Sequence, residues 1–208
     1  AAPRLIAALD DPSAPVRREA VITLAYLRLP ESVDPLRTRL RDGDASVRRV
    51  AVGALGYFIS PALLADIAGA LEDSDWRVRA EAAIVLGRSS LGGATPGLLR
   101  ALKDDFWQVQ KEAITALGRL QALAAVPELL ELLRHRVSDL RRAAAYALGE
   151  LKHVPASAAL EELAHDPDCL VAHHYARSTP VVAPRVAVHV GAAHAYGQRT
   201  HQHFAGPR

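Results

Sequence analysis

The sequence predicts an all-α fold: a right-handed α-solenoid of about six helical hairpins, each 31 residues long. The chain repeats itself every 31 residues without insertion, and each copy holds apolar residues at helical spacing. The composition agrees, because 40 of the 208 residues are alanine and only 5% are aromatic. Such a composition favours closely packed helices over an aromatic-rich sheet.

The clearest repeat marks the second helix of each hairpin. Every copy begins at an apolar anchor and has leucine eight residues later, followed by glycine in all copies but the first. The anchors are Val16, Val47, Val78, Val109 and Leu140. A sixth copy begins at Val171, but Thr179 and Pro180 replace its leucine and glycine, so we expect it to be incomplete.

A looser pattern predicts the first helix of each hairpin. Pairs of apolar residues four apart, such as Leu36 and Leu40, recur every 31 residues and share one helix face. Proline stands near the start of each of these helices, where a missing N–H is tolerated; the residues are Pro3, Pro35, Pro61, Pro96 and Pro127. Three residues before the anchor, Asp44, Asp75 and Asp168 are expected at the N-terminus of the second helix.

The second helix has a constant face and a variable face. Positions 0, +4, +7 and +8 from the anchor form an apolar stripe that we predict to be the core. Positions +2, +3, +6 and +10 lie opposite and differ between copies, which suits a binding solenoid. The candidate partner-binding residues on this variable face are Arg18, Glu19, Arg49, Tyr57, Glu81, Lys111, Arg142 and Tyr146.

The two tryptophans are further candidates for partner binding. Trp76 and Trp107 both stand two residues before an anchor, and Phe106 precedes the second. They either pack between repeats or form an aromatic ridge at one edge of the solenoid, which would suit an interaction hot spot. The sequence leaves both interpretations open.

The repeat resembles that of a known family. The pattern Asp-x-x-Val-Arg-x-x-Ala-x-x-Ala-Leu-Gly is similar to the HEAT-like repeats of the phycobilisome-lyase type, which form an armadillo/HEAT-like superhelix. Residues 44–56 match it fully, residues 75–87 match it nearly as well, and the resemblance covers roughly residues 2–175. It implies that the second helices line the concave side, and it is shared by bilin lyase subunits, deoxyhypusine hydroxylases and scaffold proteins.

The first functional interpretation is a non-catalytic scaffold or adaptor that binds a protein on its concave face without a cofactor. The alternative is a lyase or maturation-factor subunit that acts on a cofactor-bearing protein, as bilin lyases do. The sequence has no phosphate-binding GxxxxGK[ST], no GxSxG, no HExxH and no CxxC. The deoxyhypusine hydroxylases that this repeat resembles hold two irons with paired His-Glu motifs, so the resemblance implies that a di-iron site here would need the same motifs. No His-Glu dipeptide occurs here, which disfavours a di-iron oxidoreductase.

An arginine ladder raises the question of nucleic acid. Arg17, Arg48, Arg79 and Arg141 follow their anchors directly, and other HEAT-like solenoids bind duplex DNA. However, this position lies at the edge of the core stripe, where arginine can pair with an acid of the next repeat. Residues 1–168 also carry a net charge of −2, unlike a phosphate binder. We therefore expect structural ion pairs rather than nucleic-acid binding.

Composition changes after the last acidic residue, Asp168. Residues 169–208 hold four arginines, no acid and six of the nine histidines. We assign residues 1–178 to the solenoid and 179–208 to a basic, His-rich tail that we expect to be poorly ordered. The tail is alternatively an interaction segment for an acidic partner, or sequence not native to the fold. His165, Cys169, His173 and His174 are weak metal candidates, but their spacing matches no closed site, so we expect no metal.

The remaining features predict a soluble, cytoplasmic protein without a membrane span. The single cysteine rules out a disulfide framework. The longest uncharged stretch, residues 50–65, is interrupted by Pro61, and no basic-then-apolar leader opens the chain. The lack of methionine and the start almost inside a helix suggest a trimmed or fragmentary N-terminus, and simple removal of the initiator methionine is the alternative. The oligomeric state and the partner's identity have no signature in the sequence.

Overall fold

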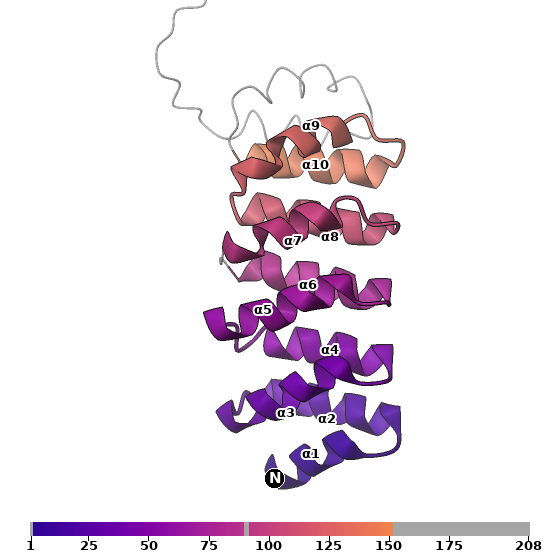
Figure 1. Cartoon of the computed structure of the whole chain (residues 1–208), viewed down its shortest axis with the longest axis vertical. Helices are drawn as coiled ribbons and strands as arrows, with labels where there is room; N and C mark the ends of the chain where they lie inside the picture. The colour runs from indigo at the N-terminus through magenta and orange to yellow at the C-terminus, as the bar shows by residue number, and fades with distance from the viewer. Residues whose placement is uncertain (1, 90–91, 152–208) are drawn as a thin grey trace, which may run out of the picture.

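A computed structural model describes residues 2–89 and 92–151 as a stack of helical hairpins (Figure 1). Ten α-helices in these residues form five hairpins of a first and a second helix, stacked along one axis. The predicted all-α solenoid is thus confirmed. The sixth repeat and the predicted tail lie outside the described residues. None of the described helices is long and apolar enough to cross a membrane.

The hairpins pair a short first helix with a longer second helix. The first helices are α1 (Ala2–Ala7), α3 (Val33–Thr38), α5 (Pro61–Gly69), α7 (Thr95–Ala101) and α9 (Val126–Leu132). The second helices are α2 (Ala14–Leu27), α4 (Ala45–Leu55), α6 (Trp76–Arg88), α8 (Trp107–Arg119) and α10 (Ser138–Glu150). In the first three hairpins a 3-10 turn continues the first helix toward the loop.

The helices begin at the residues that the sequence predicts. Asp44 caps α4, because its side chain accepts hydrogen bonds from the N–H groups of Ser46 and Val47. Asp75 caps α6 in the same way through the N–H of Arg77. A single proline occupies the first or the second position of α5, α7 and α9. Asp168, expected in the same role, lies outside the described residues.

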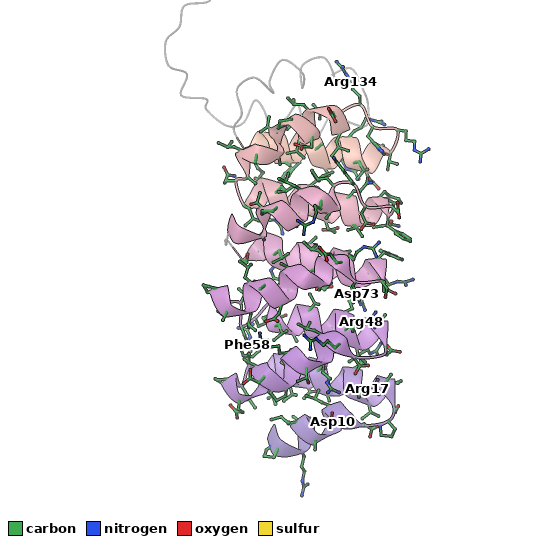
Figure 2. The ribbon with its side chains drawn as sticks, viewed as in Figure 1. Asp10, Arg17, Arg48, Phe58, Asp73 and Arg134 are labelled. Carbon is green, nitrogen blue, oxygen red and sulfur yellow. The ribbon has the colours of Figure 1, made fainter. Side chains whose placement is uncertain are left out.

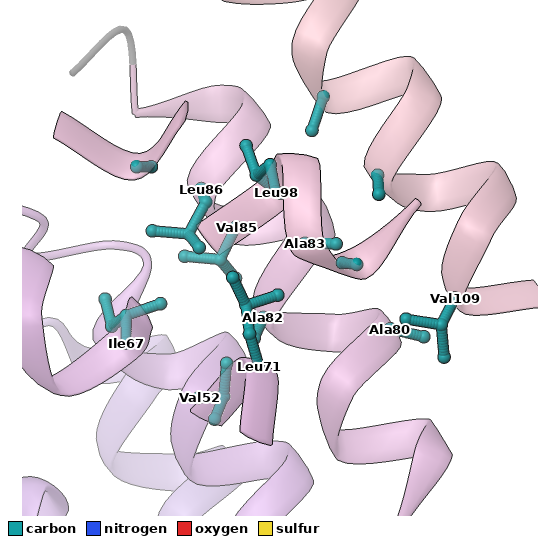
Figure 3. Close-up of a cluster of buried hydrophobic side chains, with 14 of the residues drawn as sticks. Val52, Ile67, Leu71, Ala80, Ala82, Ala83, Val85, Leu86, Leu98 and Val109 are labelled. Atoms are coloured by element: carbon teal, nitrogen blue, oxygen red, sulfur yellow. The ribbon is translucent and has the colours of Figure 1, made fainter. Parts of the chain in front are cut away.

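The core follows the predicted apolar stripe with three departures (Figure 3). Position +7 of α2 is Thr23, which is only half-buried and donates a hydrogen bond to the carbonyl of Glu19. Val16 is 42% exposed, because only one second helix, α4, packs against α2. Position +5, which the wheel left outside the stripe, is buried in every hairpin; the residues are Val21, Val52, Ala83, Ile114 and Ala145. The reason is that a second helix is covered both by its own first helix and by neighbouring second helices, so it buries more than one stripe.

The repeated glycine permits close contact between successive second helices. A Cβ atom built on Gly87 would lie 2.6 Å from the Cα atom of Ala116 in the next repeat. At Gly118 the same construction meets the Cα atom of Ala147 at 3.0 Å. A side chain at these positions would therefore push the helices apart, which explains a glycine that periodicity alone did not account for.

Ion pairs connect the repeats along one edge of the stack, where Figure 2 labels Arg17, Arg48 and Asp73. The guanidinium of Arg48 donates two hydrogen bonds to Asp73, of 2.7 Å from Nε and 2.8 Å from Nη2. Its Nη1 also donates to the backbone carbonyl of Asp42 at 2.9 Å. Each such pair therefore ties the loop before its own helix to the corresponding loop of the next repeat.

Three successive pairs share this geometry: Arg17 with Asp42, Arg48 with Asp73, and Arg79 with Asp104. The prediction that the arginines after the anchors pair with an acid of the next repeat is confirmed for these three. For Arg141, the fourth such arginine, the structure gives a hydrogen bond of 3.0 Å to the carbonyl of His135 in its own loop. The series changes at the fourth repeat, where Gln110 replaces arginine and donates instead to the carbonyl of Asp104. At the position where the acid would stand, 25 residues later, the chain has His135. A carboxylate there would have lacked its guanidinium partner.

Candidate functional site

The second helices carry the predicted variable face, and most of its candidate residues are accessible. Among them, Tyr57 is 52% exposed and Tyr146 is 37% exposed. The exposed charged residues are Arg18, Glu19, Arg49 and Arg142, whereas Glu81 and Lys111 are half-buried. The position that holds arginine or lysine in the other hairpins is Ala80 in α6, and it is buried. The face is thus interrupted in the middle of the solenoid.

A groove of about 670 Å³ opens between α2, α4 and α6. It brings together three of the predicted residues, Arg49, Tyr57 and Glu81. The other side chains that line its walls include Ile22, Tyr26, Arg28 and Arg88. The groove therefore combines aromatic and branched apolar side chains with three guanidinium groups and one carboxylate.

Gly53 makes the groove hollow. Its position on the repeat, +6, holds isoleucine in the hairpins on both sides. A Cβ atom at Gly53 would lie 3.1 Å from Oε1 of Glu81, so the carboxylate extends over the helix at the place where a side chain is missing. The absence of one side chain on α4 thus creates the space and places Glu81 within it.

Glu81 has an unusual electrostatic environment. Burial raises the pKa of its carboxyl above the ordinary value, because desolvation disfavours the charged form. Arg49 and Arg88 oppose this effect by attracting the carboxylate, and Glu112 adds to it by repulsion. The pKa of Glu81 remains raised because desolvation is the largest of these effects.

Tyr26, Arg28 and Tyr57 form the outer wall of the groove. The guanidinium of Arg28 lies 4.8 Å from the centre of the Tyr57 ring, a cation–π contact. Arg28 adopts a left-handed backbone conformation, with φ of 50°, directly after α2. Tyr26 is 86% exposed and is the most exposed of the large apolar or aromatic side chains that the structure describes.

The other predicted partner-binding residues lie elsewhere. Arg18 and Glu19 are on α2 but are not among the residues that line the groove. Lys111 belongs to α8, whereas Arg142 and Tyr146 belong to α10. Arg142 forms an ion pair with Asp139 of its own helix. These residues form a continuation of the variable face rather than a single site.

The aromatic residues at the loop edge mainly connect repeats. Trp76 stacks on Phe106 of the next hairpin, with ring centres 5.7 Å apart and an interplanar angle of 12°. Trp76 also packs against the core, whereas Phe106 and Trp107 are 42% and 37% exposed. The interpretation of packing between repeats is thus confirmed for Trp76, and an exposed edge remains at Phe106 and Trp107.

Four of the large side chains that line the groove were not among the predicted binding residues: Ile22, Tyr26, Arg28 and Arg88. Ile22, Tyr26 and Arg88 occupy variable-face positions, so their exposure was predictable, but nothing in the sequence distinguished them from the rest of that face. Arg28 follows the last turn of α2 and has no place in the helical periodicity. The signal that could have found the groove is Gly53, the one glycine at position +6 of the five repeats.

The weak metal candidates His165, Cys169, His173 and His174 lie outside the described residues. Within residues 2–89 and 92–151, no three His, Cys, Asp or Glu side chains are grouped as a metal site would require. The described carboxylates of the repeat ladder instead accept hydrogen bonds from arginine and from backbone N–H groups.

Comparison with known proteins supports the repeat assignment. A family profile described as HEAT repeats matches residues 2–87, 33–105 and 95–178. The complex of CpcE and CpcF of phycocyanin lyase from Nostoc sp. PCC7120 is similar in structure, with a TM-score of 0.65 and 26% identity over 81% of this chain and 73% of that chain. A designed armadillo repeat protein in complex with the peptide (KR)4 has a TM-score of 0.63 and 19% identity, over 84% and 98% of the two chains. Comparison with curated proteins gives no match.

Proposed function

This chain belongs to the HEAT repeat family, and we propose that it is a non-catalytic interaction scaffold whose protein partner binds on the concave face of second helices. The observation that carries the proposal is the groove between α2, α4 and α6. It is the place where the variable face is hollowed and where large side chains are left accessible. A repeat scaffold that keeps its core constant can present such a surface without changing its fold.

The chemistry of the groove supports protein binding. Tyrosine and arginine are enriched in interaction hot spots, because they supply large contact areas together with polar groups. Tyr26 and Tyr57 are both exposed and lie with Arg49 around one hollow. The designed armadillo protein of similar fold is described with a bound peptide, so a solenoid of this architecture can present a peptide-binding surface.

The test is partner capture with the full chain and matched variants. Tyr57→Ala should reduce the amount of specific partner recovered from an extract of the source organism by at least about tenfold, the loss typical of a hot-spot residue. The control is Leu123→Ala, which removes an exposed apolar side chain in the turn before α9, and it should leave recovery unchanged. Equal recovery with both variants, at unchanged thermal stability, would contradict the proposal.

A second candidate function is a lyase or maturation-factor subunit. It is favoured by the similarity to the CpcE and CpcF complex. The sequence identity to that complex, 26%, is higher than the 19% identity to the designed armadillo protein, and the match covers most of both chains. In this case the chain would act with a companion subunit on a cofactor-bearing protein. Transfer of a bilin to an acceptor protein in the presence of the companion subunit would support this candidate. A colourless protein, recovered with a stable partner and inactive in that assay, would support the scaffold.

A further inference from the structure

We propose that the groove between α2, α4 and α6 binds an extended acidic peptide with branched apolar or aromatic residues between its carboxylates. This inference rests on the proposed scaffold function and specifies the chemistry of the partner. It goes beyond the repeat fold, because neither the core nor the Arg–Asp ladder determines which charge the groove prefers.

The charge preference follows from which arginines are already paired. The ladder residue Arg48 has its carboxylate partner at 2.7 Å, and its side chain is only 14% exposed. By contrast, none of the described acids forms a salt bridge within 4.0 Å of Arg28, Arg49 or Arg88. These three guanidinium groups therefore line the groove with charge that the described part of the fold does not neutralise at contact distance.

Glu81 reduces this positive potential without cancelling it. It is the only carboxylate among the residues that line the groove, against three arginines. Arg49 and Arg88, which line the groove with it, are near enough to attract its carboxylate. An incoming peptide carboxylate would meet two favourable guanidinium groups and one unfavourable carboxylate there. A peptide with cationic side chains would meet the reverse, so the charge on the walls selects against it.

The apolar part of the preference comes from the outer wall. Ile22 is 42% exposed, and Tyr26 and Tyr57 are still more exposed. Arg28 contacts one face of the Tyr57 ring, and Tyr57 is nevertheless 52% exposed. Apolar or aromatic side chains of a partner would bury these surfaces, and alternate residues of an extended peptide point to opposite sides. Carboxylates could thus reach the arginines while apolar residues contact the wall.

The size of the groove sets the length of the peptide. Packed helices lie about 8–10 Å apart, so the three second helices span roughly 20 Å. An extended chain rises about 3.3 Å per residue, so about six residues cross them. A synthetic peptide of about seven residues, in which glutamate alternates with leucine or phenylalanine, is therefore a suitable probe.

Fluorescence anisotropy with the full chain tests the charge preference directly. The acidic probe should bind at least about tenfold more tightly than the same peptide with glutamine in place of glutamate. The lysine version should bind more weakly still. The affinity for the acidic probe should fall as salt rises, because exposed charges are screened.

Variants of the groove give effects of opposite sign. Arg49→Gln and Arg88→Gln should each weaken binding of the acidic probe by about fivefold, whereas Glu81→Gln should strengthen it. Gly53→Ile introduces the side chain found in the flanking repeats and should abolish binding by filling the hollow. Arg100→Gln is the matched control, since this exposed arginine pairs with Glu72 away from the groove and its loss should change nothing. Thermal melts of every variant check that the fold is retained.

Three results would overturn the inference. The first is that the lysine peptide binds more tightly than the acidic probe, and that Glu81→Gln weakens the binding of the lysine peptide. The second is equal binding of all three probes by wild type and Gly53→Ile. The third is no binding of any probe up to about 1 mM, the weak end of measurable affinity. None of these contradicts the scaffold proposal itself, which depends on partner capture and its sensitivity to Tyr57→Ala.

Discussion

At the scale of single residues, the Arg–Asp ladder is the main polar interaction between repeats. Both members of the Arg48–Asp73 pair are nearly buried, with side chains 14% and 11% exposed. Burial makes the pair sensitive to removal of one partner, because the other is then left desolvated and uncompensated. The ladder also explains why arginine follows the anchor in most repeats. This recurrence of arginine is the feature that raised the question of nucleic-acid binding.

We predict that Arg48→Gln lowers the free energy of unfolding by about 2 kcal/mol or more. Glutamine can still donate to the loop carbonyl, as Gln110 does, but Asp73 would lose its partner. Chemical denaturation measures the change. Arg100→Gln, at an exposed pair, should cost less than about 1 kcal/mol. In a double-mutant cycle Asp73→Asn should recover part of the loss, and fully additive effects would contradict the pairing.

The ladder also predicts the response to acid. Hydrogen bonds from Arg17 lower the pKa of Asp42 despite partial desolvation, and the pKa values of Asp73 and Asp104 are lowered as well. A carboxyl with a lowered folded-state pKa stabilises the fold above its unfolded value of about 3.9, and the contribution is lost as pH falls through the folded value. Melting temperature should therefore drop steeply below about pH 4. Asp42→Asn should show a smaller drop between pH 5 and pH 3, and an unchanged drop would count against the ladder.

At the scale of elements, the sequence predicted the helices better than their packing. Caps and prolines set the start of α4, α5 and α6, and these signals are local, so they could be identified residue by residue. The burial of position +5 and the tight approach at Gly87 depend on neighbouring repeats. A wheel drawn for one isolated helix does not contain those neighbours, which is why it assigned one buried stripe where the structure has two.

We predict that Gly87→Ala destabilises the protein by about 1–3 kcal/mol, although alanine is the better helix former. The added methyl group would overlap the backbone of Ala116 and separate α6 from α8. Gly69→Ala is the matched control: this helical glycine has no atom within 4 Å of the added Cβ, so stability should rise by up to about 1 kcal/mol. The same sign for both substitutions, in thermal or chemical denaturation, would contradict the close approach.

At the scale of the whole molecule, each repeat is stabilised by the repeats beside it. Stability is then approximately a sum of repeat and nearest-neighbour terms. Leu117, fully buried within the stack, contacts a core that is closed on both sides, whereas Leu5 in α1 is half-buried. We predict a cost of about 2–4 kcal/mol for Leu117→Ala and less than about 2 kcal/mol for Leu5→Ala. Equal costs in chemical denaturation would contradict this one-dimensional picture.

The candidate site was only partly predictable from the sequence. The variable face was predictable, because it follows from helical periodicity. Three of its residues line the groove: Arg49, Tyr57 and Glu81. The groove itself was not predictable, because it arises where a missing side chain on α4, at Gly53, coincides with Glu81 extending from α6. Such coincidences appear only when neighbouring repeats are placed side by side.

The central claim is that a partner binds in the groove of the second helices. Hydrogen–deuterium exchange of the full chain, with and without its captured partner, tests it most directly. We predict slowed exchange at the end of α2, in the turn after α4 and along α6, with the first helices α3 and α5 unchanged. Slowed exchange confined to α3 and α5, with the groove unaffected, would contradict the claim.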